Sequence, residues 1–120
     1  MDIPIRQSFR IDGESIELIV KIGGRVVGGL VAVWTGKNEM ELRHLAVAAD
    51  SQKKRLGQSL VIRLQEIAVL RGCRRIHTIA RNTSVAFFRN LGFTTVPGVS
   101  PTHPIFQRHG ITFTLMAKEL

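Results

Sequence analysis

The chain of 120 residues contains no tyrosine, one tryptophan and one cysteine, Cys73. A lone cysteine without a CxxC partner forms no internal disulfide and excludes zinc-finger and dithiol redox sites, so Cys73 is expected to be a small buried residue. Aromatic residues make up 6% and are scattered, which leaves no run for stacking on nucleic-acid bases. The sequence also lacks an uncharged apolar run of about 18 residues and a signal peptide. We therefore expect a cytoplasmic protein without membrane contact.

Acidic residues are also scarce. Asp and Glu number 9 against 17 Lys and Arg, giving a formal net charge of +8 and a sequence pI near 11.1. This balance favours an anionic partner, which could be nucleic acid, an anionic membrane surface or a phosphorylated ligand. Hydrophobic residues at 44% predict a buried core, and the length suits a single domain over residues 1–120.

The first half of the chain predicts three antiparallel strands. Residues 16–22 and 25–34 are rich in Ile and Val, and Gly23-Gly24 between them supplies a tight turn. Gly28 and Gly29 interrupt the second strand and indicate a bulge or a close backbone approach. A turn at 35–38 leads to the third strand, 39–47.

The second half predicts alternating helices and strands. Apolar residues at spacings of three and four indicate an amphipathic helix over 57–70. A strand at 74–80, a short helix at 83–91 and a last strand within 111–120 follow. The strand-helix-strand crossover places strands 42–47 and 74–80 side by side and parallel. The predicted fold is α/β with a mixed sheet.

The segment LAVAADSQKKRLGQSLVIRL, residues 45–64, is the most informative for function. A strand runs into a polar turn, and an amphipathic helix begins at once, so unpaired backbone N–H groups and the positive end of the helix dipole are exposed. Gly57 lets an anion approach the backbone, and Lys53, Lys54 and Arg55 add charge. The simpler alternative is a solvated basic loop before an ordinary helix.

Two motifs in this sequence resemble those of the GCN5-related N-acetyltransferase (GNAT) superfamily. The family's acetyl-CoA motif begins with an apolar strand that ends in Val. A few residues later comes the pattern Gln or Arg, any two residues, Gly, any one residue, and Gly or Ala. Here Val47 is followed by QKKRLG at residues 52–57. Arg55 stands where the first glycine is usual. The second motif is NTSVAFFRNLGF, residues 82–93, which resembles the family's N...A..FYekLGF helix.

The resemblance implies acetyl-CoA as cosubstrate. It implies that the strand at Leu45, Ala46 and Val47 pairs with the pantetheine arm, and that Asn82 and Phe88 flank the thiol. The residues implied to hold the pyrophosphate are Gln52, Lys53, Lys54, Arg55, Leu56, Gly57, Gln58 and Ser59. The implied fold is a mixed, mostly antiparallel central sheet with a parallel splayed pair and flanking helices. Because only about fifteen residues precede the first strong strand, the family's two N-terminal helices are expected to be reduced or absent.

Phe88 stands where many family members have a tyrosine that protonates the departing thiolate. Phenylalanine has no proton to donate, so the acid is another group or water, or the step needs none, because a thiol pKa near about 8.5 makes a tolerable leaving group. Plain core packing of Phe88 is compatible with each of these.

An amine acceptor must also lose a proton, so a base or water relay is expected. Glu41 is the best carboxylate candidate, with Glu39 as the alternative on the same strand face; a surface charge is the competing interpretation. His44 projects to the face opposite Glu41 if the strand is regular, so it and His77 are interpreted as packed side chains. His103 and His109 lie in or beside a proline-rich loop that could reach an acceptor, and the four histidines lack metal-site spacing.

The resulting hypothesis is acetyl transfer from acetyl-CoA to a primary amine of a small molecule or peptide, by direct attack in a ternary complex. The alternative is a catalytically weak CoA-binding or nucleic-acid-binding module on the same fold. We expect the acceptor side to be open, or completed by a second subunit in a homodimer.

Overall fold

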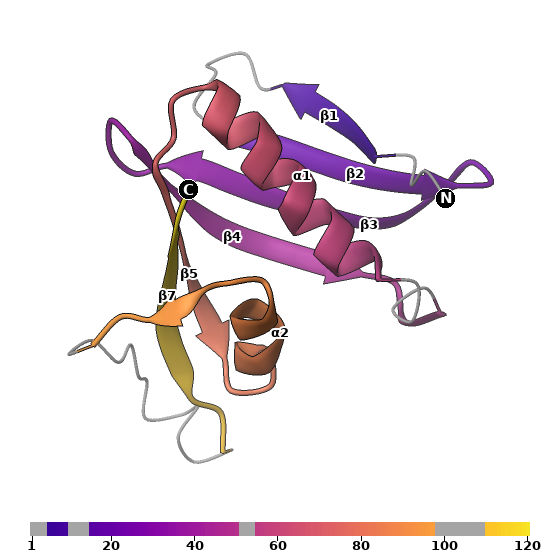
Figure 1. Cartoon of the computed structure of the whole chain (residues 1–120). Helices are drawn as coiled ribbons and strands as arrows, with labels where there is room; N and C mark the ends of the chain where they lie inside the picture. The colour runs from indigo at the N-terminus through magenta and orange to yellow at the C-terminus, as the bar shows by residue number, and fades with distance from the viewer. Residues whose placement is uncertain (1–4, 10–14, 51–54, 98–109) are drawn as a thin grey trace.

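The computed structural model describes residues 5–9, 15–50, 55–97 and 110–120. They form one seven-stranded sheet in the order β1-β2-β3-β4-β5-β7-β6, with β4 and β5 as the parallel pair among otherwise antiparallel neighbours (Figure 1). The strands are β1 (Ile5–Phe9), β2 (Ser15–Ile22), β3 (Arg25–Trp34), β4 (Glu39–Val47), β5 (Arg75–Arg81), β6 (Thr94–Thr95) and β7 (Phe113–Glu119). The mixed, mostly antiparallel sheet is confirmed.

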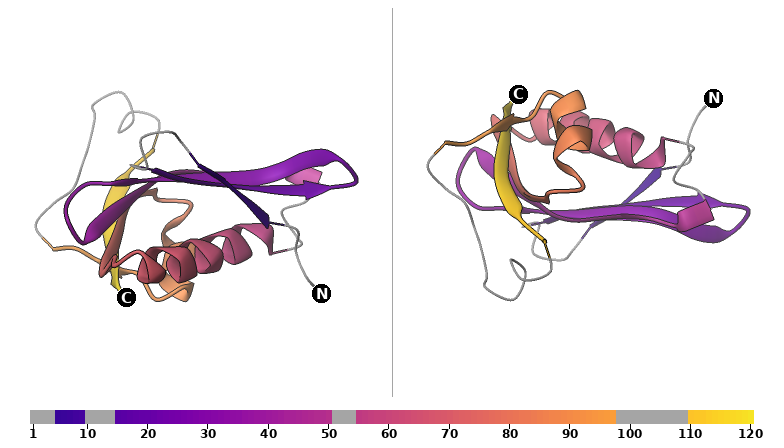
Figure 2. Two further views of the ribbon diagram at one scale, coloured as in Figure 1. Left: turned by 90° about the horizontal axis from the view of Figure 1, so that it is seen from above. Right: turned by 90° about the horizontal axis from the view of Figure 1, so that it is seen from below.

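Two helices, α1 (Leu56–Leu70) and α2 (Val85–Asn90), lie on the same face of the sheet (Figure 2). In the described part of the chain, no helix precedes α1. The opening of the chain differs from the prediction in one respect: β1 precedes the three predicted strands and pairs with β2 at the sheet edge. Its sequence, IRQSF, is short and mostly polar, as edge strands often are, which is why it gave no strand signal.

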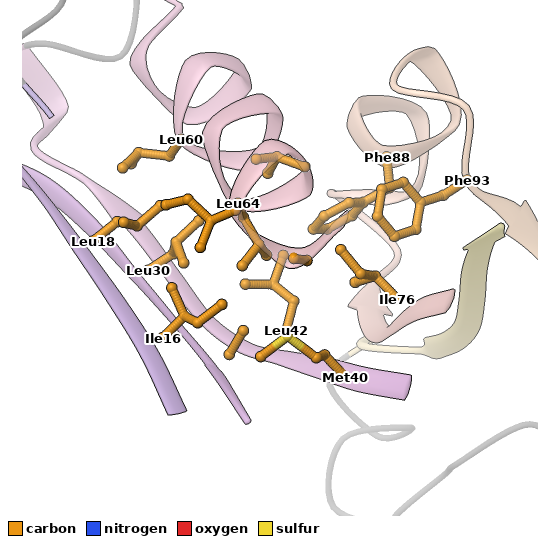
Figure 3. Close-up of a cluster of buried hydrophobic side chains, with 14 of the residues drawn as sticks. Ile16, Leu18, Leu30, Met40, Leu42, Leu60, Leu64, Ile76, Phe88 and Phe93 are labelled. Carbon is orange, nitrogen blue, oxygen red and sulfur yellow. The ribbon is translucent and has the colours of Figure 1, made fainter. Parts of the chain in front are cut away.

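The core lies between α1 and the strands. Leu60, Val61 and Leu64 of α1 are fully buried, and Leu60 and Leu64 point toward Leu18 and Leu30 of the sheet (Figure 3). This stripe explains why the apolar period of the sequence forms one continuous helix.

The glycines of β3 permit close strand packing. A Cβ on Gly29 would lie 2.9 Å from the carbonyl oxygen of Leu18, and one on Gly28 would lie 3.1 Å from that of Ala46. The pairing of β2 with β3 also shifts register between Val20 and Lys21. The sequence predicted a bulge or a close backbone approach around these glycines, and the structure has both.

A second irregularity occurs in β4. Val31 pairs with His44 and Ala32 pairs with Leu42, so Arg43 is an extra residue between them. A bulge of this kind reverses the alternation of side chains beyond it. His44 therefore lies on the same face as Glu41, and the prediction that it faces the other way is wrong because the strand is not regular.

Cys73 is 4% exposed, as predicted for a small buried residue. Burial raises the pKa of its thiol, although the Sγ donates a hydrogen bond of 3.3 Å to the carbonyl oxygen of Arg75. A buried thiol of this kind is a poor nucleophile.

Candidate active site

The two parallel strands separate part of the way along their length. β4 pairs with β5 from Glu39–Arg75 to Leu42–Thr78; after these residues β4 continues beside β3 and β5 beside β7 (Figure 1). The strands predicted to be parallel neighbours are so, but the paired residues of β4 are 39–42 rather than 42–47. The bulge at Arg43 follows the last pair directly, and it bends the strand where the sheet opens.

Two adjoining cavities follow the opening between the strands, one of about 440 Å³ and one of about 190 Å³. They share Leu45, Ser84 and Phe87, so we treat them as one cleft. The larger part is also lined by Val47, Arg55, Gly57 and Gln58, and the smaller part by Leu42, Arg43, Thr78, Ile79, Ala80, Arg81 and Phe88. The cleft therefore connects the start of α1 to the last paired residues of β4 and β5.

The start of α1 supplies the polar end of this cleft. No side chain caps the helix within the described residues, and its first turn contains no acidic residue. A helix beginning in this way presents backbone N–H groups and a partial positive charge to the cleft. This end can attract an anion, and Arg55 adds a full positive charge beside it.

Arg55 is the one described non-glycine residue with positive φ, at 58°. This left-handed conformation suits glycine and explains structurally why a glycine would be usual there. Gly57 has an ordinary helical backbone, and a Cβ on it would meet the Phe87 ring at 3.5 Å, which is normal contact. Gly57 thus matters for the space that it leaves open in the cleft, and not for a special backbone angle.

The residues suggested by the acetyl-CoA motif lie in different places. Leu45 and Val47 line the cleft, whereas Ala46 lies on the other face of the sheet opposite Gly29. Gln58 lines the cleft, Leu56 is buried in the core, and the Ser59 hydroxyl donates to the carbonyl oxygen of Arg55. Gln52, Lys53 and Lys54 lie outside the described residues.

The residues suggested for the thiol end also differ in their surroundings. Phe88 is 6% exposed, packs against Phe87 and Phe93, and contributes to the wall of the smaller cavity. Asn82 does not line either cavity; its side chain donates to the carbonyl oxygen of Gly110 and its backbone N–H to that of Thr112.

Sequence reasoning missed Ser84 and Phe87, which line both parts of the cleft. A serine just before a short helix is itself a signal for a helix start, and it could have placed Ser84 at the mouth of α2. Its hydroxyl makes no capping hydrogen bond with α2. Ser84 therefore lines the cleft where its two parts meet, and its hydroxyl does not cap α2.

The other face of the sheet carries a cluster of charged side chains at the same level. Met40 and Leu42 are buried beneath the helices, so Glu39 and Glu41 point to the face without helices. His77 of β5 lies between them: its Nδ1 is 2.6 Å from Glu39 Oε2 and its Nε2 is 3.2 Å from Glu41 Oε2. The alternative of a simple surface charge does not describe Glu41, which is 20% exposed and has two partners.

The electrostatics of Glu41 follow from those partners. Burial acts to raise the pKa of its carboxyl, but hydrogen bonds from Arg43 and His77, and their charges, hold that pKa below its ordinary value. The Arg43 Nε lies 2.6 Å from Glu41 Oε1. Glu41 is thus a carboxylate at neutral pH, with one oxygen held by arginine and the other directed at histidine.

The described residues provide no group of at least three His, Cys, Asp or Glu side chains arranged for a metal ion. Neither described helix has the length and apolar character that crossing a membrane requires. His103 and His109, considered for the acceptor side, lie outside the described residues.

Comparison with known proteins agrees with this architecture. The model of the acetyltransferase (GNAT) family matches residues 2–93. More than half of the chain is matched, so the protein belongs to the GNAT acetyltransferase family.

Solved structures show the same fold at low sequence identity. An IAA acetyltransferase from Bacillus cereus ATCC 14579 superposes with a TM-score of 0.78 at 19% identity, covering 99% of this chain and 100% of that one. An aminoglycoside 6'-N-acetyltransferase complexed with coenzyme A gives 0.77 at 18%, covering 91% and 74%. The PaiA N-acetyltransferase of Thermoplasma acidophilum, also in complex with coenzyme A, gives 0.75 at 15%, covering 91% and 63%. Proteins of this fold have thus been crystallised with coenzyme A.

Proposed function

We propose that this protein transfers the acetyl group of acetyl-CoA to a primary amine of a small molecule or peptide. The amine attacks the thioester directly in a ternary complex. The observation that carries the proposal is the cleft that joins the start of α1 to the last paired residues of β4 and β5. It has an anion-attracting end and an apolar arm, as a nucleotide joined to a pantetheine chain requires.

The pyrophosphate is assigned to the start of α1. The backbone N–H groups of the first helical turn, at Leu56, Gly57 and Gln58, point toward that end of the cleft. Arg55 supplies charge, and the open space above Gly57 allows the phosphates to approach the backbone. Lys53 and Lys54 are assigned to the same anion because they directly precede this turn in the sequence.

The pantetheine arm is assigned to the opening between β4 and β5. There β4 pairs with β5 as far as Leu42, whereas its pairing with β3 continues beyond that residue, so the β4 edge at Leu45 can accept an extended ligand, as an added strand would. The thioester then lies near Leu42, Thr78 and Phe88, where the smaller cavity ends.

The acceptor amine is assigned to the face of the sheet that bears Glu41. An amine with an ordinary lysine-like pKa of about 10.4 carries a proton at pH 7, and removing it costs about 4.6 kcal/mol. Glu41 lies one residue before the end of the parallel pairing and is a carboxylate, so it can receive that proton. The same face has a shallow hollow of about 580 Å³ beside His44 and Ala46, which leaves room for the acceptor.

In this assignment the departing thiolate can be stabilised by a hydroxyl of the protein or by water. Phe88 lines the cavity without a proton to give, whereas Ser84, which carries a hydroxyl, lines both cavities. A thiol is also an acceptable leaving group in water, so a positioned acid is an accelerating feature rather than a requirement.

Cofactor binding is tested by isothermal calorimetry on the whole chain with acetyl-CoA. We expect a Kd in the micromolar range, and a rise in melting temperature at saturating ligand. Gly57→Trp fills the larger cavity and should abolish binding, whereas Gly57→Ala, whose Cβ has room beside Phe87, should retain it. Absence of binding to the folded wild type at millimolar ligand would contradict the proposal.

Turnover is tested separately by thiol release from acetyl-CoA in the presence of a panel of primary amines. Amine-dependent release supports the enzyme. Binding of CoA without release by any amine would instead support the alternative, a CoA-binding domain without catalysis.

A further inference from the structure

We propose that His77 stores the proton that Glu41 removes from the acceptor amine, while Glu39 holds the imidazole from its other side. His77 is thus a positioning and proton-holding residue behind Glu41. This inference rests on the proposed function, because it gives the proposed base a partner and a destination for the proton.

The geometry places one imidazole between two carboxylates. Glu41 and His77 are directly paired across the parallel strands, and Glu39 precedes Glu41 by two residues on the same face. The His77 Nε2 lies 3.2 Å from Glu41 Oε2, which is a hydrogen bond when a proton lies between the two atoms, and its Nδ1 lies 2.6 Å from Glu39 Oε2, which is an ion pair once the ring is protonated. The Nδ1 contact lacks hydrogen-bond direction, so Glu39 acts on the ring chiefly through its charge. The His77 side chain is 15% exposed, which limits competition from water.

The proton count of an imidazole explains why this arrangement can act as a store. A neutral imidazole has one N–H and one lone pair, whereas the protonated ring has two N–H groups. Each ring nitrogen of His77 faces a carboxylate oxygen. With a neutral ring, one of these two gaps between nitrogen and oxygen contains no proton. With the N–H at Nδ1, the empty gap lies between Nε2 and Glu41 Oε2 and can accept one proton.

The surrounding charges are close to balance. Arg75 contacts Glu39 and Glu119, and Arg43 contacts Glu41, so three carboxylates face two guanidinium groups around His77. This described cluster carries one net negative charge with a neutral ring and none with a protonated ring. His44 lies on the same face farther along β4, and β3 contributes the uncharged Val33 opposite Glu41. A carboxylate beside an imidazole favours the charged form of the ring.

The proposed step balances as a proton transfer without a covalent change in the protein. The ammonium form of the acceptor gives one proton to the gap between Glu41 and His77, which yields the free amine and the imidazolium. The amine nitrogen then forms its bond to the thioester carbon, and the C–S bond breaks with its electron pair leaving on sulfur. The second proton, which the nitrogen loses as the neutral amide forms, goes to this thiolate and gives the free thiol of CoA. Because the carboxylates and the ring share one proton, their titration belongs to the cluster as a whole.

The kinetic test is the pH dependence of kcat/KM between pH 6 and 9, with an amine that the wild type accepts. If the base works, the wild-type kcat/KM should be nearly constant from the pH at which the cluster loses its proton up to the pKa of the amine. His77→Gln keeps an amide that can donate to Glu41 but cannot take up a proton, so we expect about a 100-fold lower value at pH 7. Its kcat/KM should rise about tenfold per pH unit, following the free amine, with the KM for acetyl-CoA within about twofold.

Glu66→Gln is the control. It removes an exposed carboxylate of α1 that pairs with Arg63 and belongs to neither the cluster nor the cleft, and it should keep the wild-type profile. A His77→Gln profile of wild-type shape, merely scaled down, would show a structural role and overturn the proposal.

A second measurement needs no acceptor. NMR of the His77 ring nitrogens in the ligand-free protein should show a change of protonation with pH, and Glu39→Gln and Glu41→Gln should each alter that change. A ring that does not titrate, or whose midpoint ignores both substitutions, overturns the proton store even if acetyl transfer occurs. Loss of the proposed function is recognised differently, by a wild type that releases no thiol with any amine, and it removes the proton store with it.

Discussion

The Thr78 hydroxyl donates a hydrogen bond of 3.0 Å to the carbonyl oxygen of Leu42. These two residues are the last matched pair of the parallel strands, and both are buried. A side chain therefore joins the strands where their backbones begin to separate. The contact holds the closed end of the cleft at a defined position.

Thr78→Val tests this connection. Valine keeps the shape of threonine but leaves a buried carbonyl without this donor, which should lower the free energy of unfolding by about 1–2 kcal/mol. Urea denaturation measures the change, and Thr78→Ser, which keeps the hydroxyl, should retain more of the stability than valine does. A valine variant as stable as the wild type would show that the hydrogen bond contributes nothing.

Arg55 gives a prediction about the backbone. Its left-handed φ of 58° disfavours side chains, and the positions after it are helical. We expect Arg55→Gly to be more stable than Arg55→Ala by about 1 kcal/mol, because glycine adopts this left-handed φ without a steric cost. Denaturation of the two variants measures this difference without interference from the lost charge, which both share. Equal stability, or a more stable alanine variant, would contradict the assigned backbone strain.

Glu41 gives a prediction about stability and pH. Its folded-state pKa lies below the ordinary value of 4.5, so the unfolded chain binds the proton more readily. The stability that Glu41 contributes is present above that ordinary value and is lost as pH falls through the lower folded-state value. The stability difference between wild type and Glu41→Gln should therefore shrink as the pH is lowered from 6 to 3. A difference that stays constant would show that the charge interactions with Arg43 and His77 do not stabilise the fold.

Local signals in the sequence were sufficient for most of the elements. Gly23-Gly24 predicted the β2–β3 hairpin, and the period of three and four predicted α1, because each signal depends on neighbouring residues. The parallel placement of β4 and β5 followed from the crossover rule. The bulge in β4 could not be predicted from such local signals, because Arg43 is an extra residue only relative to the partner strand β3.

The charged cluster shows the same limit. Glu39 and Glu41 share a face by simple alternation, which the sequence predicted, but His77 lies 36 residues beyond Glu41 and joins them through the sheet register. A packed histidine was a fair interpretation of His77 from its strand alone. Its two carboxylate partners became apparent from the tertiary structure, and so did the position of Ser84 on the wall shared by both cavities.

The last prediction concerns the hydroxyl that this chain lacks at position 88. Phe88→Leu should weaken packing against Phe87 and Phe93, at a cost of about 1–2 kcal/mol, and lower the affinity for acetyl-CoA. It removes no titrating group, so the shape of the pH–rate profile should not change. Phe88→Tyr should raise kcat because its hydroxyl enters the smaller cavity, which Phe88 lines.

Ser84→Ala completes this comparison, because it removes the hydroxyl that lies at the shared wall of the cleft while leaving the aromatic packing intact. If Ser84 stabilises the departing thiolate, kcat should fall about tenfold with acetyl-CoA binding unchanged, and Phe88→Tyr in the same chain should restore part of the loss. Thiol-release kinetics on the two single variants and the double variant measure this rescue. Wild-type kcat in Ser84→Ala would mean that the thiolate leaves without a hydroxyl from the protein, and the tyrosine substitution should then give no gain.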